Sequence, residues 1–167
     1  MELLACELSF PNGESVESDS CIGPKACFRA ESDILGSSCI GNATCAEVGA
    51  DLIDTQACVG DLACANSFSN GQTVGQSLGG GQSGFSCVGK SACALSSATI
   101  GSASCQNPFS CSLMTAFQIF DESCVGEYAC SEAFASSSRV GGKSCLGHSS
   151  CFRSMADTIE DDACIGT

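Results

Sequence analysis

Residues 21–27 are CIGPKAC, residues 39–45 are CIGNATC and residues 58–64 are CVGDLAC. The same pattern returns at 87–93 as CVGKSAC and at 124–130 as CVGEYAC. In each copy two cysteines stand six residues apart. An aliphatic residue and a glycine follow the first cysteine, and a small residue precedes the second. This self-similarity marks the chain as a repeat protein and predicts its fold.

The 16 cysteines of the 167-residue chain all follow this repeat. Seven pairs have the six-residue spacing, and Cys6 and Cys164 stand alone before the first pair and after the last. The pairs are Cys21/Cys27, Cys39/Cys45, Cys58/Cys64, Cys87/Cys93, Cys105/Cys111, Cys124/Cys130 and Cys145/Cys151. Each repeat therefore contains two six-residue segments that end in cysteine and a third segment that carries all the variation in length.

Three six-residue segments make one 18-residue coil, and extra residues lengthen only the third side. The longest extension, residues 70–82 (NGQTVGQSLGGGQ), is rich in Gly and Gln, and we predict a flexible loop there. The length of the chain and its continuous repeat predict a single domain over residues 1–167.

The spacing of the aliphatic residues does not follow the 3.6-residue period of a helix, and Gly and Ser recur too often for one. We therefore predict an all-β fold, a three-sided parallel β-solenoid of about eight coils, each of 18–21 residues. Stacking at about 4.8 Å per coil would give a rod roughly 40 Å long.

The segments IGNATC at 40–45 and VGDLAC at 59–64 resemble the hexapeptide repeat of left-handed β-helices. That repeat places Gly after an aliphatic residue, and Ser, Thr or Ala three residues further on. The resemblance covers nearly the whole chain and implies a left-handed, three-sided solenoid. The chain departs from the family in having cysteine at the sixth place of two segments per coil. It is more loosely similar to cysteine-rich repeat proteins of algae and to insect antifreeze solenoids, and this likeness implies no site.

An even number of cysteines at this density is typical of a disulfide scaffold in an oxidising compartment, either extracellular or the lumen of an organelle. Strict strand alternation would point the cysteines outward as two ladders between coils, with Ser and Ile inside. A bend at each cysteine would instead turn the thiols inward to cross-link the coil. Pairing of consecutive cysteines, from Cys6–Cys21 to Cys151–Cys164, would also use all sixteen. Spacing does not choose between these schemes.

Buried thiols and metal ligation are the alternatives to disulfides. Zinc sites usually use Cys-x-x-Cys with His, which differs from the five-residue gap here, so we predict no metal and no cofactor. The net charge of −13, with only six Lys and Arg, excludes a nucleic-acid-binding surface. No run of about 18 apolar residues predicts a membrane span.

The sequence offers little for catalysis, and we predict that the chain is not an enzyme. The resemblance to hexapeptide-repeat enzymes implies a catalytic or metal-binding His, but His148 is the only histidine and falls at a predicted exposed corner. The acidic clusters at 121–122 and 157–162 lack the spacing of a calcium loop, so we interpret them as a solvated face. Asn42 begins an N-x-[ST] motif, a possible glycosylation site.

The functional hypothesis depends on the first and last segments of the repeat. Met1 and Ile165 have equivalent places in the repeat, and neither end carries a predicted polar cap, although an open solenoid end exposes both core and strand edge. We therefore expect a non-enzymatic, disulfide-stapled structural or interaction rod. Either the chain is a piece of a longer solenoid, or its partners are copies of itself stacked end to end or other subunits of a larger assembly, such as a filament. The alternative is a ligand-binding solenoid for ice, a metal ion, a mineral or a glycan surface.

Overall fold

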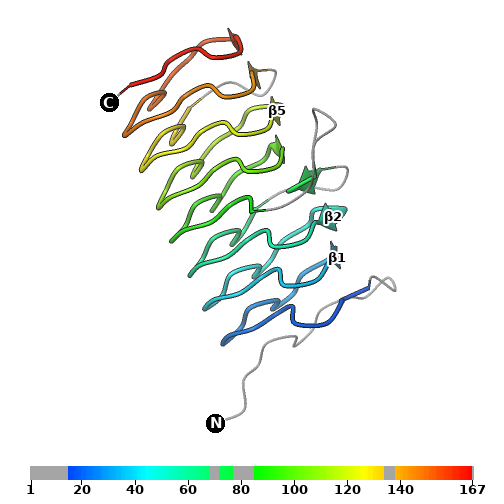
Figure 1. Ribbon diagram of the computed structural model, residues 1–167. Coiled ribbons are helices and arrows are strands. Elements are labelled where there is room, and N and C mark those ends of the chain that lie inside the picture. Colours follow the sequence, from blue (N-terminus) through cyan, green and yellow to red (C-terminus); the bar gives the residue numbers. More distant parts are fainter. Residues whose placement is uncertain (1–14, 68–71, 77–84, 134–137, 167) are drawn as a thin grey trace.

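The computed structural model describes residues 15–67, 72–76, 85–133 and 138–166, which wind into a stack of parallel coils (Figure 1). These residues contain no helix, and each coil contributes one two-residue strand to a single seven-stranded parallel sheet. The strands are β1 (Asp33–Ile34), β2 (Leu52–Ile53), β3 (Thr73–Val74), β4 (Thr99–Ile100), β5 (Gln118–Ile119), β6 (Arg139–Val140) and β7 (Thr158–Ile159). The prediction of an all-β parallel solenoid is confirmed.

One long edge of the rod, which we call the strand side, is formed by β1–β7. Each strand pairs only with its neighbours in sequence, and Val16 adds one further bridge to Ile34 below β1. Because strand side chains alternate, the first residue of each strand points outward and the second points inward. The inward residues are buried in one continuous column: Ile34, Ile53, Val74, Ile100, Ile119, Val140 and Ile159.

The opposite edge, the turn side, runs from the first cysteine of each pair to the second residue after the second cysteine. It contains isolated parallel bridges, such as Ile22–Ile40 and Ile40–Val59, rather than two-residue strands like those of the strand side. Backbone hydrogen bonds still join its coils, for example from Gly41 N–H to Ile22 O at 2.8 Å. Regular strands are absent among the described turn-side residues because the backbone turns sharply there.

Left-handed backbone geometry causes these sharp turns and decides between the two arrangements that the sequence left open. The first cysteine of every described pair has φ between 54° and 57°, well outside the β region. The chain therefore bends at this residue, and its side chain points into the coil. The structure has the bend and not the strict strand alternation: Cys39 is buried, whereas Ile40 is only half-buried.

Close packing of backbone explains the glycine that follows this aliphatic residue. Gly60 has φ of +127°, and a Cβ atom there would lie 2.7 Å from the carbonyl oxygen of Gly89 in the next coil. Only glycine tolerates both this conformation and this approach. Coil stacking on the turn side therefore favours glycine at this place, which Asn107, with φ of 96°, fills in the Cys105–Cys111 coil.

Two predictions fall partly or wholly beyond the described residues. Of the loop predicted at 70–82, the structure describes 72–76, and these residues contain β3 of the sheet. Cys6 lies outside the described residues.

Candidate functional site

Seven disulfides cross the turn side, one in each coil. Each joins the two cysteines of a pair, with Cα atoms 5.4–5.6 Å apart. The bonded pairs are Cys21–Cys27, Cys39–Cys45, Cys58–Cys64, Cys87–Cys93, Cys105–Cys111, Cys124–Cys130 and Cys145–Cys151. Of the pairing schemes that spacing left open, the structure adopts the inward cross-link within each coil. Cys164 is the one free cysteine among the described residues, and it is exposed.

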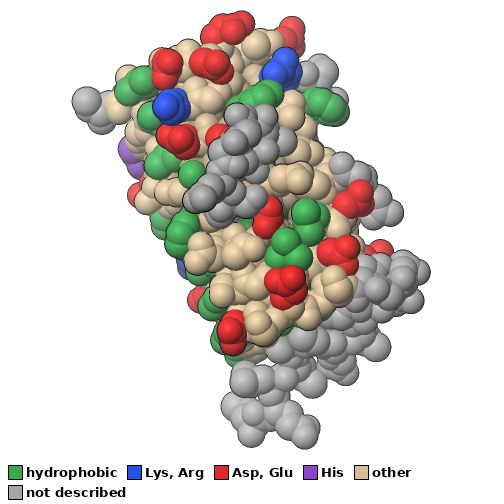
Figure 2. All heavy atoms as spheres, turned by 45° about the vertical axis from the view of Figure 1, so that its right-hand side comes forward, with side chains coloured by type: hydrophobic (Ala, Val, Ile, Leu, Met, Phe, Trp, Pro, Cys, Tyr) green, Lys and Arg blue, Asp and Glu red, His purple; other side chains and the backbone are tan. Residues whose placement is uncertain are grey.

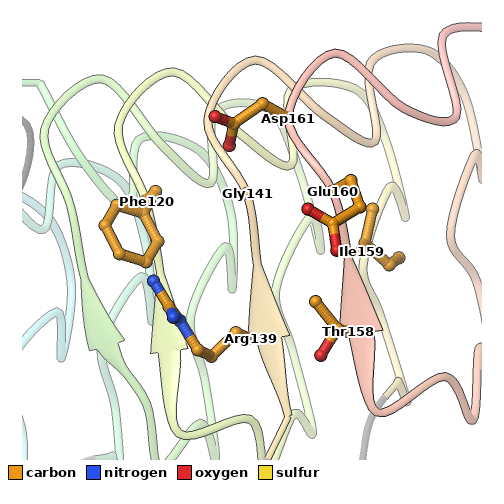
Figure 3. A pocket seen from close by; sticks show the side chains of 7 residues that line it. All are labelled: Phe120, Arg139, Gly141, Thr158, Ile159, Glu160 and Asp161. Carbon is orange, nitrogen blue, oxygen red and sulfur yellow. The ribbon is translucent and has the colours of Figure 1, made fainter.

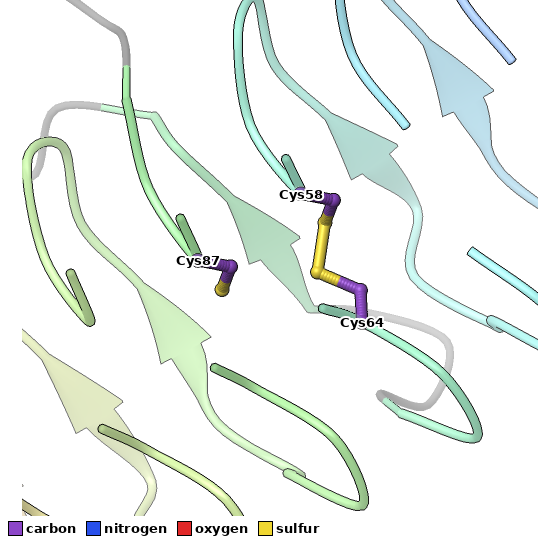
Figure 4. Close-up of side chains that lie close together, drawn as sticks. All are labelled: Cys58, Cys64 and Cys87. Carbon is purple, nitrogen blue, oxygen red and sulfur yellow. A yellow bond between two sulfur atoms is a disulfide. The ribbon is translucent and has the colours of Figure 1, made fainter. Parts of the chain in front are cut away.

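The disulfides form a sulfur column inside the rod. The Sγ atom of Cys87 lies within 4.8 Å of both sulfurs of the Cys58–Cys64 disulfide in the preceding coil (Figure 4). Cys93 approaches Cys105 and Cys111, and Cys145 approaches Cys124 and Cys130, in the same way. Since each of these sulfurs is already bonded to another, the column offers no thiolate to a metal ion. The disulfides instead fill the interior of the coils.

A column of buried serines lies just before the first cysteines and connects the turn side to the strand side. The Ser38 hydroxyl donates to the backbone oxygen of Asp54 at 2.6 Å, and the Ser104 hydroxyl donates to that of Phe120 at 2.7 Å. Each bond runs to the residue after the strand of the next coil. These hydroxyls therefore satisfy buried carbonyls and hold neighbouring coils in register.

Several carboxylates bind the backbone of a neighbouring coil rather than standing free. Asp161 Oδ1 accepts the Gly142 N–H at 2.8 Å, Asp121 Oδ1 accepts the Ser102 N–H at 3.0 Å, and Asp61 Oδ1 accepts the Asn42 N–H at 2.9 Å. Figure 2 shows acidic side chains spread over one face of the rod, with few cations between them. Many of the acidic residues thus have a structural role at turns as well as a solvated position.

Asp33 shows the same interaction at the lower end of the sheet. The Ser15 amide donates to Asp33 Oδ1 at 2.7 Å, and the Ser15 hydroxyl donates to the same oxygen at 3.0 Å. The amide bond, then the hydroxyl bond, stabilise the charged form and lower the pKa of the Asp33 carboxyl, against a small opposing effect of burial.

A shallow hollow of about 280 Å³ opens on the strand side near the upper end of the rod (Figure 3). The Arg139 guanidinium lies over the Phe120 ring, 4.7 Å from its centroid, and Thr158, Glu160 and Asp161 line the other wall. The lining includes neither a histidine nor a cysteine. The hollow therefore has a cation and two carboxylates in its lining, without a thiol or an imidazole among them.

Two residues singled out in the sequence lie on the turn side. His148 is exposed, with Nδ1 3.9 Å from Glu127 Oε2 and its ring edge-on to Tyr128. Asn42 is exposed, whereas Thr44 of the same motif is buried and its hydroxyl donates to Gly60 O at 2.9 Å. His148 and Asn42 thus lie on separate coils, and the structure does not bring them together.

The two end faces differ from the interior of the rod. Ile22 and Ile165 belong to the column of residues that follow the first cysteines, and they are 50% and 63% exposed, whereas their counterparts between them are half-buried. In the strand-side column Val16 is 38% exposed, whereas the interior members are fully buried. Ile165 stands out in the sequence as a residue of the last repeat, whereas Val16 and Ile22 do not stand out, because only their place in the stack distinguishes them from interior residues.

The comparisons with known proteins give a family and no activity. The family model described as "Domain of unknown function (DUF7640)" matches the chain twice in tandem, at residues 2–79 and 84–167. No curated protein and no solved structure shows significant similarity to the chain. None of the described residues belongs to a helix long and apolar enough to cross a membrane.

Proposed function

The chain belongs to DUF7640, a family of domains of unknown function, and from its architecture we propose that it is a non-enzymatic structural rod that joins a larger assembly through its end faces. The rod is stapled by its disulfides, and it stacks end to end or docks as a subunit of a filamentous complex. The single observation that supports this proposal is the exposure of the aliphatic columns at both ends of an otherwise closed stack.

The coils of the rod are joined through their backbones. Within the rod an interior coil donates to the next coil and to the one before it. For example, the Ile22 N–H donates to Cys39 O at 3.2 Å, while the Gly41 N–H donates to Ile22 O. Ile22 and Ile165, at the two ends of the described stack, are more exposed than the members of their column between them. Since a parallel backbone edge with exposed apolar residues readily pairs with another chain, these faces favour association.

The chemistry of the side chains favours a role without catalysis. The one histidine is an exposed turn residue, and Asp61, Asp121 and Asp161 are engaged with backbone N–H groups. General acid–base or nucleophilic catalysis requires titratable groups that converge on one reacting atom. The proposed rod instead contributes a rigid shape and two adhesive ends.

The disulfides support a place in an oxidising compartment, outside the cell or in the lumen of an organelle. Fourteen described cysteines form disulfides, and the two cysteines of each bond are six residues apart in sequence. Cytosolic thiol systems would keep such cysteines reduced. Stable disulfides also suit a structural part, because they hold each coil in the shape that stacking needs.

Sedimentation velocity over a wide range of concentrations, with electron microscopy of the same samples, tests the proposal. We expect the oxidised chain to form species larger than a monomer, growing with concentration into rods or filaments. A chain that stays monomeric at the highest concentration contradicts the proposal. If such a monomer also melts at a higher temperature with a metal ion or a glycan present, or binds to growing ice crystals, it supports a ligand-binding solenoid instead.

A further inference from the structure

The Asn-Ala-Thr motif at residues 42–44 lies inside a disulfide loop of the turn side. Cys39 and Cys45 close this loop, and all three residues of the motif stand between them. The chain contains one motif of this kind, and the proposed role as a rod makes no use of it. Oligosaccharyl transferases modify the asparagine of such a motif in chains that enter the secretory pathway, where disulfides also form.

Asn42 lies at an outward corner that can carry a bulky group. The third residue after the first cysteine is exposed in all seven described coils: Pro24, Asn42, Asp61, Lys90, Pro108, Glu127 and His148. The backbone of Asn42 takes part in stacking, since its N–H donates to Asp61 Oδ1 at 2.9 Å and its carbonyl accepts the Leu62 N–H at 3.0 Å. No hydrogen bond joins its side-chain amide to the described residues. A glycan on this amide would therefore project into solvent without breaking a contact between coils.

Thr44, in contrast, is fully buried in the closed coil, and its hydroxyl donates to Gly60 O in the next coil at 2.9 Å. The backbone around it is also held on both sides. The Ala43 N–H donates to Pro24 O at 2.8 Å, and the Cys64 N–H donates to Thr44 O at 2.9 Å. Because the motif requires a hydroxyl two residues after the asparagine, the transferase must reach that hydroxyl. The folded rod denies this access.

The two residues that complete the motif occur together in one coil only. In the other six described pairs the residue before the second cysteine is alanine or serine: Ala26, Ala63, Ala92, Ser110, Ala129 and Ser150. The buried place thus needs only a small side chain. Threonine stands there only in the coil whose corner residue is asparagine. A glycosylation motif explains why Asn42 and Thr44 occur together.

We propose that Asn42 carries an N-linked glycan, which is transferred before the coil of Cys39–Cys45 closes. In the transfer, Asn42 Nδ2 attacks the anomeric carbon of an oligosaccharide that is held on a lipid pyrophosphate. A C–N bond forms, the bond from that carbon to the pyrophosphate oxygen breaks, and the lipid pyrophosphate leaves with the electron pair. The amide proton passes to a base of the transferase. Cys39 and Cys45 then pass two electrons and two protons to a disulfide of an oxidoreductase, which becomes a dithiol as their own bond forms.

The order of the two reactions follows from the geometry of the loop. In the closed loop Ala43 has φ of 50°, and the coil of Cys58–Cys64 supplies the Gly60 carbonyl that binds the Thr44 hydroxyl. The unfolded chain has neither constraint, so both Asn42 and Thr44 are accessible there. Transfer therefore precedes closure of the loop and stacking of the following coil. This inference rests on the proposed oxidising compartment and not on assembly through the end faces.

Glycosyl transfer in vitro tests the order. The full chain is made in a host without N-glycosylation and oxidised, and one portion is then unfolded, reduced and alkylated so that it stays unfolded. Both portions receive purified oligosaccharyl transferase and a lipid-linked oligosaccharide, and intact mass with peptide mapping measures the occupancy of Asn42. We expect transfer to the folded chain to be at least tenfold slower than transfer to the unfolded chain.

A second motif in the same chain provides the matched control. Met155→Asn with Asp157→Thr places the same tripeptide at residues 155–157, where all three residues are exposed and follow the last described disulfide, Cys145–Cys151. We expect the folded double variant to accept a glycan at this motif and not at Asn42. Equal rates of transfer to the two motifs of the folded chain contradict the proposed order.

Secretion of the full chain, with an added leader peptide, from eukaryotic cells tests the site itself. We expect the secreted chain to lose mass when a glycosidase removes N-linked glycans, and Asn42→Gln to lose none. A secreted double variant with a glycan at residues 155–157 and none at Asn42 overturns the proposal. Neither experiment reads self-association, so a failure here leaves the proposed structural rod standing.

Discussion

The turn side and the strand side of the rod both stack parallel coils, but they tolerate sequence change very differently. On the turn side all seven described pairs keep the same six-residue spacing, each is closed by a disulfide, and backbone approaches backbone too closely for a Cβ atom at Gly60. On the strand side only two residues per coil need to be in register.

This difference explains where the repeat varies in length. A two-residue strand fixes one inward residue and a few hydrogen bonds, so the chain on either side of it can lengthen at a small entropic cost. An extra residue within a turn-side segment would separate the cysteines and move the glycine from its contact. The turn side, with its disulfides, therefore fixes the shape of each coil, and the strand side accommodates insertions.

Reduction of the turn-side disulfides should have the largest effect. The chain is first unfolded with the seven described disulfides reduced, and it is then returned to native buffer with reductant. We expect that it does not regain the solenoid. Each short cysteine loop contributes about 2 kcal/mol by constraining the unfolded chain, and seven such terms exceed the net stability of most domains. Far-ultraviolet circular dichroism measures the outcome. Cys164→Ser, which alters only the free thiol, should leave the oxidised rod unchanged.

If the reduced chain refolds with its original circular dichroism spectrum, packing and not the disulfides fixes the shape of each coil. The difference between the turn side and the strand side would then depend on backbone packing alone.

A pair of glycine substitutions compares the two sides directly. Gly60→Ala on the turn side should destabilise the rod by about 3 kcal/mol, because alanine is strained at φ of +127° and its Cβ meets the Gly89 carbonyl. At Gly142, near the strand side, the nearest atom to a new Cβ is 3.5 Å away, so Gly142→Ala should change stability by less than about 1 kcal/mol. Denaturant unfolding under oxidising conditions measures both, and equal effects would remove the proposed asymmetry.

Two buried serines, Ser104 just before a turn side and Ser110 within it, sharpen the comparison. Ser104→Ala should cost about 1 kcal/mol, since it leaves the Phe120 carbonyl without its hydroxyl donor. Ser110 is equally buried, but its hydroxyl has no hydrogen-bond partner, so Ser110→Ala should be neutral or stabilising. Thermal unfolding of the two variants measures the difference. A larger loss for Ser110→Ala would contradict this account of how coils are held in register.

Protonation of Asp33, on the strand side, should produce the smallest of these effects. The Asp33 carboxyl has a lowered pKa in the folded chain, so its stabilising contribution is present above the pKa of the unfolded chain, about 4, and is lost as pH falls through the folded value. We expect Asp33→Asn to lower the melting temperature slightly at pH 7 and not at all in strong acid. Ser15→Ala should reduce the difference, and a pH-independent effect of Asp33→Asn would show that the Ser15 contact contributes nothing.

Most of the fold can be predicted from the sequence because the residues that define each coil recur at regular intervals. The aliphatic residue of each strand, the glycine and the small residue before the second cysteine recur at fixed places, so a stacked coil is the only arrangement that gives each one the same environment every time. The inward direction of the cysteines could not be predicted. It depends on φ near +55° at non-glycine residues such as Cys39 and Ala43, a conformation for which sequence patterns lead one to expect Gly or Asn.

The end faces show the same limit. Ile22 and Ile40 have the same neighbours in sequence, and only the stack makes one an exposed end residue and the other an interior one.

The amino-acid sequence by itself determined the coil: its length, its parallel stacking, and the side on which insertions occur, because a periodic pattern fixes which residues must share an environment. The tertiary structure alone decided the disulfide partners and the left-handed turns. These depend on backbone atoms of neighbouring coils meeting in space: the hydrogen bonds between coils hold Cys39 and Ala43 in a conformation that neither residue would adopt in an isolated coil.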